Sequence, residues 1–194
     1  MSLKFVKKVS EAPPERAEEL HELLLSLDLP DGRLSPAQLE KVIEAVAKRP
    51  DLYEDLIVAD RESRWWLLLY RTPSFEVKLL TWENGQESDW HDHGGSSGAF
   101  RVTAGSLLER HRAADSVSVD SASFGVGGYG SFATDYVHDV VFESGDPAVS
   151  IHAYSPPLSG LTYYEQTRFG FIAREFVEEE RRSMFRTTQP DFED

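Results

Sequence analysis

Apolar side chains recur at helical spacing in two stretches near the beginning of the chain. Between Pro14 and Leu27, leucine and alanine return every third or fourth position among Glu and Arg, which is typical of an amphipathic helix. A second stretch begins at Ser35, has proline at the first helical position and stops before Pro50, so it carries both a start and a stop signal. The segment RPDLYEDLI, residues 49–57, can add a short third helix. We therefore expect two or three N-terminal α-helices within roughly residues 14–56.

The pattern changes to strand-like alternation after Arg64. In FEVKLLTW, Val77 and Leu79 alternate with charged residues, and residues 98–110 and 148–157 form further apolar or alternating runs. Short strands separated by turn signals favour a sandwich or barrel. The Gly-rich segment 121–133 fits a loop or a bulged strand, residues 167–183 combine a last strand with a short charged helix, and the tail 187–194 has the composition of a poorly ordered end. We expect a single domain over residues 1–194, with an all-β core at roughly 64–175 and a charged C-terminal tail.

The charge balance narrows the classes of partner. The chain has 34 Asp and Glu against 20 Lys and Arg, a net charge of -14, which opposes binding to nucleic acid or anionic lipid. No apolar run approaches the roughly 20 residues that span a bilayer, and residues 1–15 lack the long apolar stretch of a signal peptide. We expect a soluble, cytoplasmic protein without nucleic acid or membrane partners.

The absence of cysteine restricts the chemistry. With 0 Cys and 6 His, any metal site must be built from histidines and carboxylates. His91 and His93 are separated by one residue in a strand-like segment, so both side chains project from one face as a chelating pair and Asp92 points the other way. Imidazole suits iron, copper, zinc and nickel, and His138 is the best candidate for a third ligand. His21 and His111 are better explained as surface residues.

The surroundings of these histidines carry a family resemblance. The segment GQESDWHDHGGSSGAFRVTAGSL fits the first cupin motif, with Gly85, His91, His93 and Gly105 in place, and Gly98 stands where most cupins have a Glu ligand. Together with SIHAYSPPL at 150–158, this resembles the thiol dioxygenase branch of the cupins, the cysteine dioxygenase family, and especially its bacterial members. The resemblance spans roughly residues 75–158, although the second cupin motif keeps only its histidine. It implies a cupin-type β-barrel, or jelly roll.

The resemblance also implies a cofactor and a reaction. Members of this family hold Fe(II) with three histidines and no protein carboxylate, which here are His91, His93 and His138. A neutral ligand set leaves the iron its full positive charge and open positions, which suits capture of a thiolate and an amine. The implied reaction is oxidation of a small-molecule thiol by O₂ to a sulfinic acid, with conversion of L-cysteine to cysteine sulfinic acid the favoured case.

Ser150, His152 and Tyr154 alternate along one predicted strand, so all three face the same side. In the family an equivalent row lies beside the iron. Carried over, Tyr154 is the acid or hydrogen-bond donor toward substrate or oxygen, His152 orients it, and Ser150 is the outer member. The alternative is a buried polar row that satisfies only its own hydrogen bonds.

The substrate carboxylate needs a partner, and the family usually provides an Arg before the strand that leads to the H-x-H motif. Alignment without gaps places Leu68 near that position, and Arg64 and Arg71 flank it. If the inward face of Val77 and Leu79 continues backwards, Arg71 faces the barrel interior, so Arg71 is our first choice and Arg64 the next.

Other functions stay open at this point. They are a dioxygenase for 3-mercaptopropionate or a similar thiol, another metal-dependent cupin enzyme, and a non-catalytic metal-binding cupin. The row of Ser150, His152 and Tyr154 favours the enzyme, because a passive binding barrel has no need for it. We expect a monomer or a weak homo-oligomer.

Overall fold

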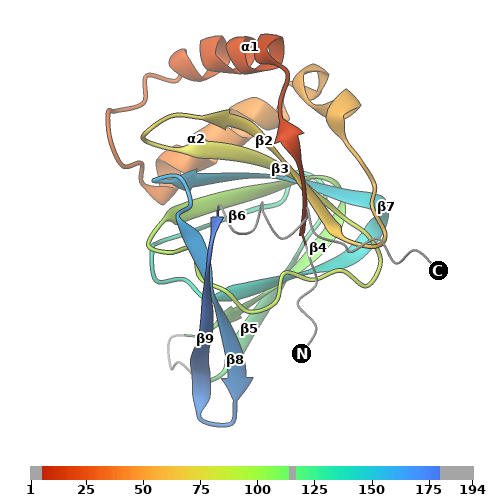
Figure 1. Ribbon diagram of the computed structural model, residues 1–194, viewed down its shortest axis with the longest axis vertical. Helices are drawn as coiled ribbons and strands as arrows, with labels where there is room; N and C mark the ends of the chain where they lie inside the picture. The colour runs from red at the N-terminus through yellow and green to blue at the C-terminus, as the bar shows by residue number, and fades with distance from the viewer. Residues whose placement is uncertain (1–5, 114–116, 180–194) are drawn as a thin grey trace, which may run out of the picture.

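A computed structural model describes residues 6–113 and 117–179 of the chain (Figure 1). Its helical elements are α1 (Pro14–Leu25), α2 (Pro36–Ala47) and two short 3₁₀ turns, η1 (Pro50–Leu52) and η2 (Glu54–Leu56). Its strands are β1 (Val6–Glu11), β2 (Arg64–Arg71), β3 (Glu76–Trp82), β4 (Ser97–Arg112), β5 (Val119–Phe124), β6 (Tyr129–Phe132), β7 (His138–Ser155), β8 (Gly160–Thr167) and β9 (Gly170–Glu178). Within the described residues, none of the helices combines the length and the apolar character needed to cross a membrane.

The two predicted helices are confirmed. Helix α2 begins where the sequence places it: Pro36 occupies its first turn, and the Ser35 backbone N–H donates to Gln38 Oε1 at 2.8 Å. That side-chain bond satisfies one of the backbone groups that a helix start leaves without a helical partner. The predicted third helix is instead the pair of 3₁₀ turns at 50–56.

The strands form a mainly antiparallel sheet in the order β1-β2-β3-β7-β4-β5, with β6 on β4, and β8 pairs with β9. Strand β1 pairs in parallel with β2, and the sequence analysis assigned no element to that segment. The Gly-rich segment contains the end of β5, a turn and β6. The predicted charged helix lies mostly outside the described residues, and the tail 187–194 lies wholly outside them.

Strands β4 and β7 are the longest and pair along nearly their whole lengths, with register shifts near Gly105. Gly105 has φ +68°, and a Cβ there would lie 2.9 Å from the Ala148 Cβ and closer still to the Ser144 carbonyl oxygen. Only glycine fits such a close approach in the left-handed region. The motif glycine therefore allows the two strands to change course together.

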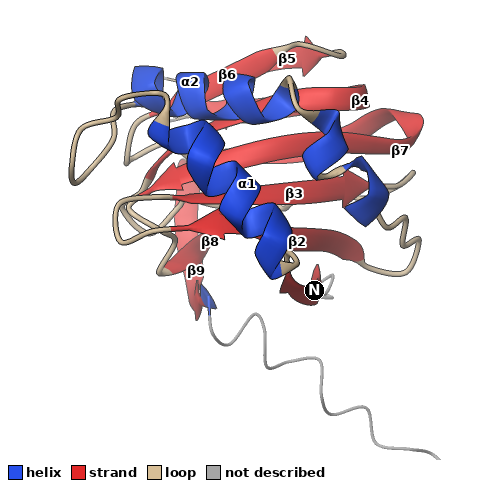
Figure 2. Cartoon of the chain, turned by 90° about the horizontal axis from the view of Figure 1, so that it is seen from above, coloured by secondary structure: helices blue, strands red, loops and turns tan. Residues whose placement is uncertain are grey.

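The sheet has a helix-covered face and an inner face. On the first, leucine, isoleucine and valine residues of α1 and α2 pack against Trp65, Leu67, Val77 and Leu79, and Figure 2 shows both helices lying across the strands. This corrects the predicted direction of Val77 and Leu79. They face the helices, because the helices need an apolar partner layer, and the alternate residues of β2 and β3 face the barrel interior.

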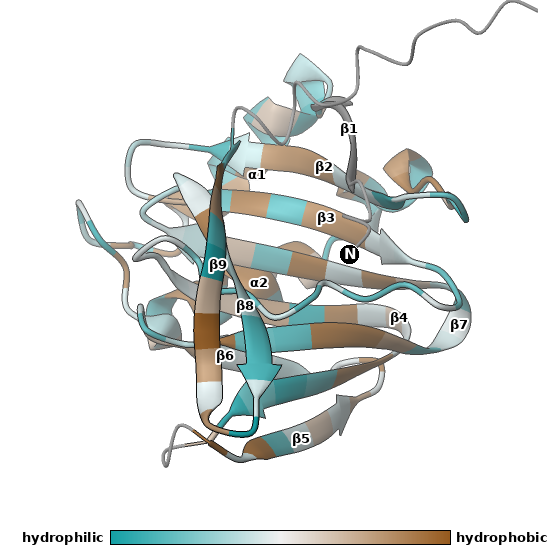
Figure 3. Cartoon of the chain, turned by 60° about the horizontal axis from the view of Figure 1, so that its bottom comes forward, coloured by the Kyte–Doolittle hydropathy of each residue, from teal (hydrophilic) through white to brown (hydrophobic). Residues whose placement is uncertain are grey.

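The β8–β9 hairpin crosses in front of the inner face (Figure 3). Asp92 attaches it to the H-x-H segment: its carboxylate accepts from the Thr162 backbone N–H at 3.2 Å and from the Tyr164 hydroxyl at 2.8 Å. Trp90 packs edge-on against Phe171, with ring centroids 4.7 Å apart. The inner face is thereby enclosed between the sheet and the hairpin.

Candidate active site

His91, His93 and His138 meet at the enclosed inner face. Their potential ligand nitrogens all lie within 4.8 Å of one another, and the three residues are buried. The ring centroids are 4.8 Å apart for His91 and His138 and 4.9 Å apart for each of the other two pairs. One ion can contact all three rings of such a triangle.

Backbone pairing places these rings together. The His91 N–H donates to the His138 carbonyl at 2.8 Å, and the His138 N–H donates back at 3.0 Å. His91 forms isolated bridges to His138 and Tyr163 rather than part of the continuous strand that the sequence analysis expected. The H-x-H segment is therefore held between the start of β7 and the hairpin.

The donor set fits a transition metal ion. The His91 Nδ1 lies 2.8 Å from the Asp89 carbonyl oxygen, and the His138 Nδ1 lies 2.7 Å from Glu109 Oε1. Because each Nδ1 carries the proton of its ring in these bonds, each Nε2 is left as a lone-pair ligand. Neutral imidazoles suit Fe, Zn, Cu and Ni.

The packing around Gly98 leaves no room for the Glu ligand that most cupins have at this position. A Cβ at Gly98 would overlap the ring of Phe132. That ring stacks on His93 with centroids 4.4 Å apart. A Glu at position 98 would displace Phe132 and with it the packing behind a ligand.

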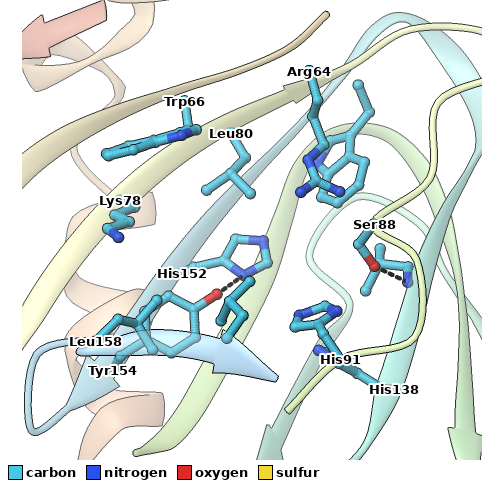
Figure 4. A pocket seen from close by; sticks show the side chains of 13 residues that line it. Arg64, Trp66, Lys78, Leu80, Ser88, His91, His138, His152, Tyr154 and Leu158 are labelled. Atoms are coloured by element: carbon cyan, nitrogen blue, oxygen red, sulfur yellow. Dashed lines mark hydrogen bonds between the residues drawn. The ribbon is translucent and has the colours of Figure 1, made fainter. Parts of the chain in front are cut away.

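Ser150, His152 and Tyr154 form the hydrogen-bonded row that their alternation predicts. Ser150 Oγ lies 2.8 Å from His152 Nε2. His152 Nδ1 lies 3.0 Å from the Tyr154 hydroxyl, and Figure 4 draws this second bond. The Trp82 indole N–H donates to Ser150 Oγ at 2.9 Å and so adds a fourth member.

This network assigns the proton positions. Ser150 is fully buried and accepts from Trp82, so its own proton is best satisfied by His152 Nε2. His152 then donates from Nδ1 to the Tyr154 oxygen, and the phenol can donate its proton to a group in the pocket. Burial lowers the pKa of His152 to about 3, with His138, Arg64 and Lys78 adding in the same direction. His152 is therefore neutral at pH 7, as this arrangement requires.

One pocket joins the histidines to the row. It is a cavity of about 40 Å³, which has room for a small molecule rather than a large one. Besides His91, His138, His152 and Tyr154, its lining includes residues of β2, β3 and nearby segments: Arg64, Trp66, Lys78, Leu80, Trp82, Ser88, Val140, Leu158 and Leu161. Figure 4 shows Arg64 and Lys78 on opposite sides of the pocket.

The two cations of the pocket differ in their partners. Arg64 donates to the Glu87 carbonyl at 3.0 Å, and its guanidinium lies over the Trp82 ring at 5.1 Å. Lys78 Nζ lies 3.0 Å from Glu76 Oε1 and 2.6 Å from Glu179 Oε1. Lys78 is thus already engaged by two carboxylates.

The structure does not bring Arg71 to the histidines. Arg71 lies at the end of β2, its side chain is 45% exposed, and it pairs with Glu76 at 3.0 Å. It lines two outer depressions of the surface and not the pocket. The expected inward direction fails because the inner face belongs to the other set of alternate residues and a register shift occurs between Leu68 and Tyr70.

The two histidines that the sequence assigns to the surface lie outside the cluster. His21, in α1, is 2.7 Å from the Tyr70 hydroxyl through Nδ1. His111 lies in β4, and its ring stacks on Tyr136.

Glu109 is the residue that sequence reasoning missed. It is 5% exposed and its carboxylate contacts the ring of His138. The available signal is its parity: Glu109 is in phase with Leu107, which is fully buried on β4. A Glu in phase with a buried strand position is unusual unless it is paired.

Residues 32–167 match the sequence profile of a family described as cysteine dioxygenase type I. The chain belongs to the cysteine dioxygenase type I family. This membership and the observed sheet confirm the predicted cupin-type β-barrel with preceding helices. It points to thiol dioxygenase activity, and the three-histidine cluster of this cysteine dioxygenase family member can bind a metal ion.

Several solved structures resemble this chain in backbone fold. TT1209 from Thermus thermophilus is 19% identical, with a TM-score of 0.48 over 54% of this chain and 93% of that one. A conserved protein with a double-stranded β-helix domain from Klebsiella pneumoniae is 14% identical, with a TM-score of 0.47 over 63% and 93%. A cupin-2 domain protein from Shewanella frigidimarina is 15% identical, with a TM-score of 0.40 over 52% and 85%. These likenesses say nothing of activity.

Proposed function

We propose that this protein is an Fe(II)-dependent thiol dioxygenase that converts a small thiol, with L-cysteine favoured, into its sulfinic acid. The observation that carries the proposal is one small pocket lined by two members of a carboxylate-free histidine triangle, His91 and His138, and by the end of the hydrogen-bonded row at Tyr154. The reaction balances as RSH + O₂ → RSO₂H, in which sulfur is oxidised and both oxygen atoms are retained in the product.

The residues would divide the work as follows. His91, His93 and His138 would hold Fe(II), which when bound supplies open coordination positions and the redox chemistry. Tyr154 would donate a hydrogen bond to the reacting group, and His152 would hold the phenol in place. The enclosed, buried pocket would exclude bulk water from the site.

We propose Arg64 as the partner of the substrate carboxylate. Its guanidinium lines the pocket and can form a bidentate pair with a carboxylate. Lys78 also lines the pocket, but the carboxylates of Glu76 and Glu179 already offset its positive charge. Arg71 is too far along β2 to line the pocket with the histidines.

We also propose that the reaction takes place in the cytoplasm. Thiols are kept reduced in that compartment, so a free thiol substrate is available there.

The test is O₂ consumption by Fe(II)-loaded protein with cysteine, 3-mercaptopropionate and cysteamine, followed by mass spectrometry of the product after turnover in ¹⁸O₂. We expect a sulfinic acid that carries two labelled oxygens. The His138→Ala variant, which lacks one proposed ligand, should lose both iron and activity while remaining folded. Disulfide and hydrogen peroxide as the products would instead reveal a thiol oxidase, and iron-loaded protein that leaves every thiol untouched would contradict the proposal.

A further inference from the structure

The side chains of Glu109 and His138 form a buried contact next to the three clustered histidines. Glu109 Oε1 lies 2.7 Å from His138 Nδ1, and the two side chains are 6% and 3% exposed. The register explains the contact: on β4 and β7, Glu109 is paired with Val140 and His111 with His138. The carboxylate therefore reaches diagonally across to the neighbouring position of the partner strand.

Tyr136 packs beside this contact. Burial raises the pKa of the Tyr136 phenol strongly, and the charge of Glu109 and a hydrogen bond to it act in the same direction. The Tyr136 ring also lies edge-on to His138, with centroids 5.3 Å apart. Glu109 is thus a buried carboxyl group that accepts a hydrogen bond from the imidazole of His138, and the phenol of Tyr136 packs beside that imidazole.

This contact would affect the binding of a metal ion by His138 rather than the binding of the substrate. A carboxylate that accepts from Nδ1–H fixes the tautomer and orientation of the ring and raises the basicity of Nε2. His91 has a neutral carbonyl at the corresponding place, so among the described ligand contacts of His91 and His138 only that of His138 supplies negative charge.

We propose that Glu109 is the positioning residue that sets the metal affinity of the site, by supplying through the His138 ring the negative charge that the ligands themselves lack. The inference rests on the proposed metal site, and it deepens the proposed function without depending on which thiol is oxidised. Loss of such a partner typically costs about 10–100-fold in metal affinity.

The test compares Glu109→Gln with wild-type protein in the binding of Co(II), which reports on coordination through its visible spectrum. Affinity is measured by competition with a chelator, without thiol, and the free energy of unfolding of the metal-free protein is measured alongside. Gln keeps an oxygen that accepts from Nδ1–H and removes only the charge. We expect Co(II) affinity to fall by roughly tenfold, with a shifted Co(II) spectrum.

Two matched variants separate charge from packing. Tyr136→Phe removes the phenol hydroxyl beside this contact and keeps the carboxylate of Glu109 on His138, so its Co(II) affinity should equal or exceed that of the wild type. Glu83→Gln alters another buried glutamate, which faces Arg61 at 3.9 Å rather than a histidine, and should leave Co(II) affinity and spectrum unchanged.

The inference is overturned if Glu109→Gln binds Co(II) as the wild type does, or if Tyr136→Phe weakens binding as much as Glu109→Gln. Failure of the proposed function would look different. Wild-type protein would then bind Co(II) or Fe(II), with the dependence on Glu109 intact, and oxidise no thiol.

Discussion

The Tyr154 hydroxyl is the point at which the buried hydrogen-bond row opens into the pocket. His152 donates to its oxygen, so the phenol is oriented without giving up its own proton. The chain contains 0 Cys, which leaves the ring without any thiol to which it could become covalently joined. Its orientation therefore depends on hydrogen bonds and on the stacking of His93, with centroids 5.3 Å apart.

Tyr154→Phe should lower turnover of the best thiol by about 10²–10⁴-fold, the usual contribution of a proton-donating group. Its iron content should match that of the wild type, because Tyr154 is not one of the clustered ligands. Tyr53→Phe is the matched control: its buried hydroxyl contacts the Ala47 carbonyl in the helix layer, and the variant should turn over normally. Wild-type turnover in Tyr154→Phe would show that the phenol has only a structural role.

Arg64→Gln should raise KM for cysteine by about 10–100-fold, which corresponds to the loss of a charge-assisted hydrogen bond. Cysteamine has no carboxylate, so its KM should change little. Arg71→Ala provides the comparison, because it removes a guanidinium that lies outside the pocket. Steady-state kinetics with both thiols measure these changes in KM. A larger cysteine-specific rise in KM for Arg71→Ala than for Arg64→Gln would identify Arg71 as the partner of the substrate carboxylate.

The site could be predicted from the sequence as far as spacing alone determines it. The row at 150, 152 and 154 needs only the two-residue period of a strand, and the H-x-H pair is found from its spacing although it lies outside the continuous strands. Glu109 and Arg64 need the register between strands, which one chain's pattern does not contain. The predicted inward direction of Arg71 has the same origin, since both faces of β3 are buried and hydropathy does not show which face holds the pocket.

At the scale of elements, Gly105 controls the course of the two long strands. Gly105→Ala should lower the free energy of unfolding by about 1–2 kcal/mol for the left-handed backbone and by about 1–3 kcal/mol more for crowding against β7. Gly127→Ala isolates the first contribution, because Gly127 has φ +85° with nothing within 4 Å of a Cβ. Urea denaturation measures both variants, and equal losses would mean that the close approach to β7 costs nothing.

The elements were predictable where a local signal was strong. Helix α2 has its serine, its proline and four buried apolar residues at helical spacing, and the sequence places its start correctly. Strand β1 has a charged, short sequence and is defined by its pairing with β2, so no local pattern reveals it. The segment at 50–56 has a composition that favours a helix, but it is short and forms only two 3₁₀ turns.

At the scale of the whole molecule, His152 links stability to pH. Its pKa falls from the ordinary 6.5 to about 3 in the folded protein. Below pH 6.5 the unfolded chain therefore binds a proton that the folded protein refuses. The corresponding stability is fully present above pH 6.5 and is lost as pH falls toward 3, at about 1.4 kcal/mol per pH unit.

The free energy of unfolding should therefore depend less steeply on pH in metal-free His152→Gln than in the metal-free wild type. The variant is expected to be less stable at pH 7, because a buried hydrogen-bonded ring is replaced, but to lose less stability between pH 6 and pH 4. Urea denaturation at several pH values measures the difference, and the carboxylates common to both proteins cancel from it. The same pH dependence of the free energy of unfolding in both proteins would contradict a neutral, buried His152.

The pocket draws its two kinds of residue from different parts of the sheet. Strand β7 carries His138 and the row that ends at Tyr154, whereas Arg64, Trp66 and Lys78 stand on β2 and β3. The residues proposed for chemistry and those proposed for recognition thus lie in separate stretches of the sequence. If the proposed roles hold, substitutions on β2 and β3 can change which thiol is bound while the residues of β7 stay the same, so one thiol can replace another in evolution without loss of the reaction.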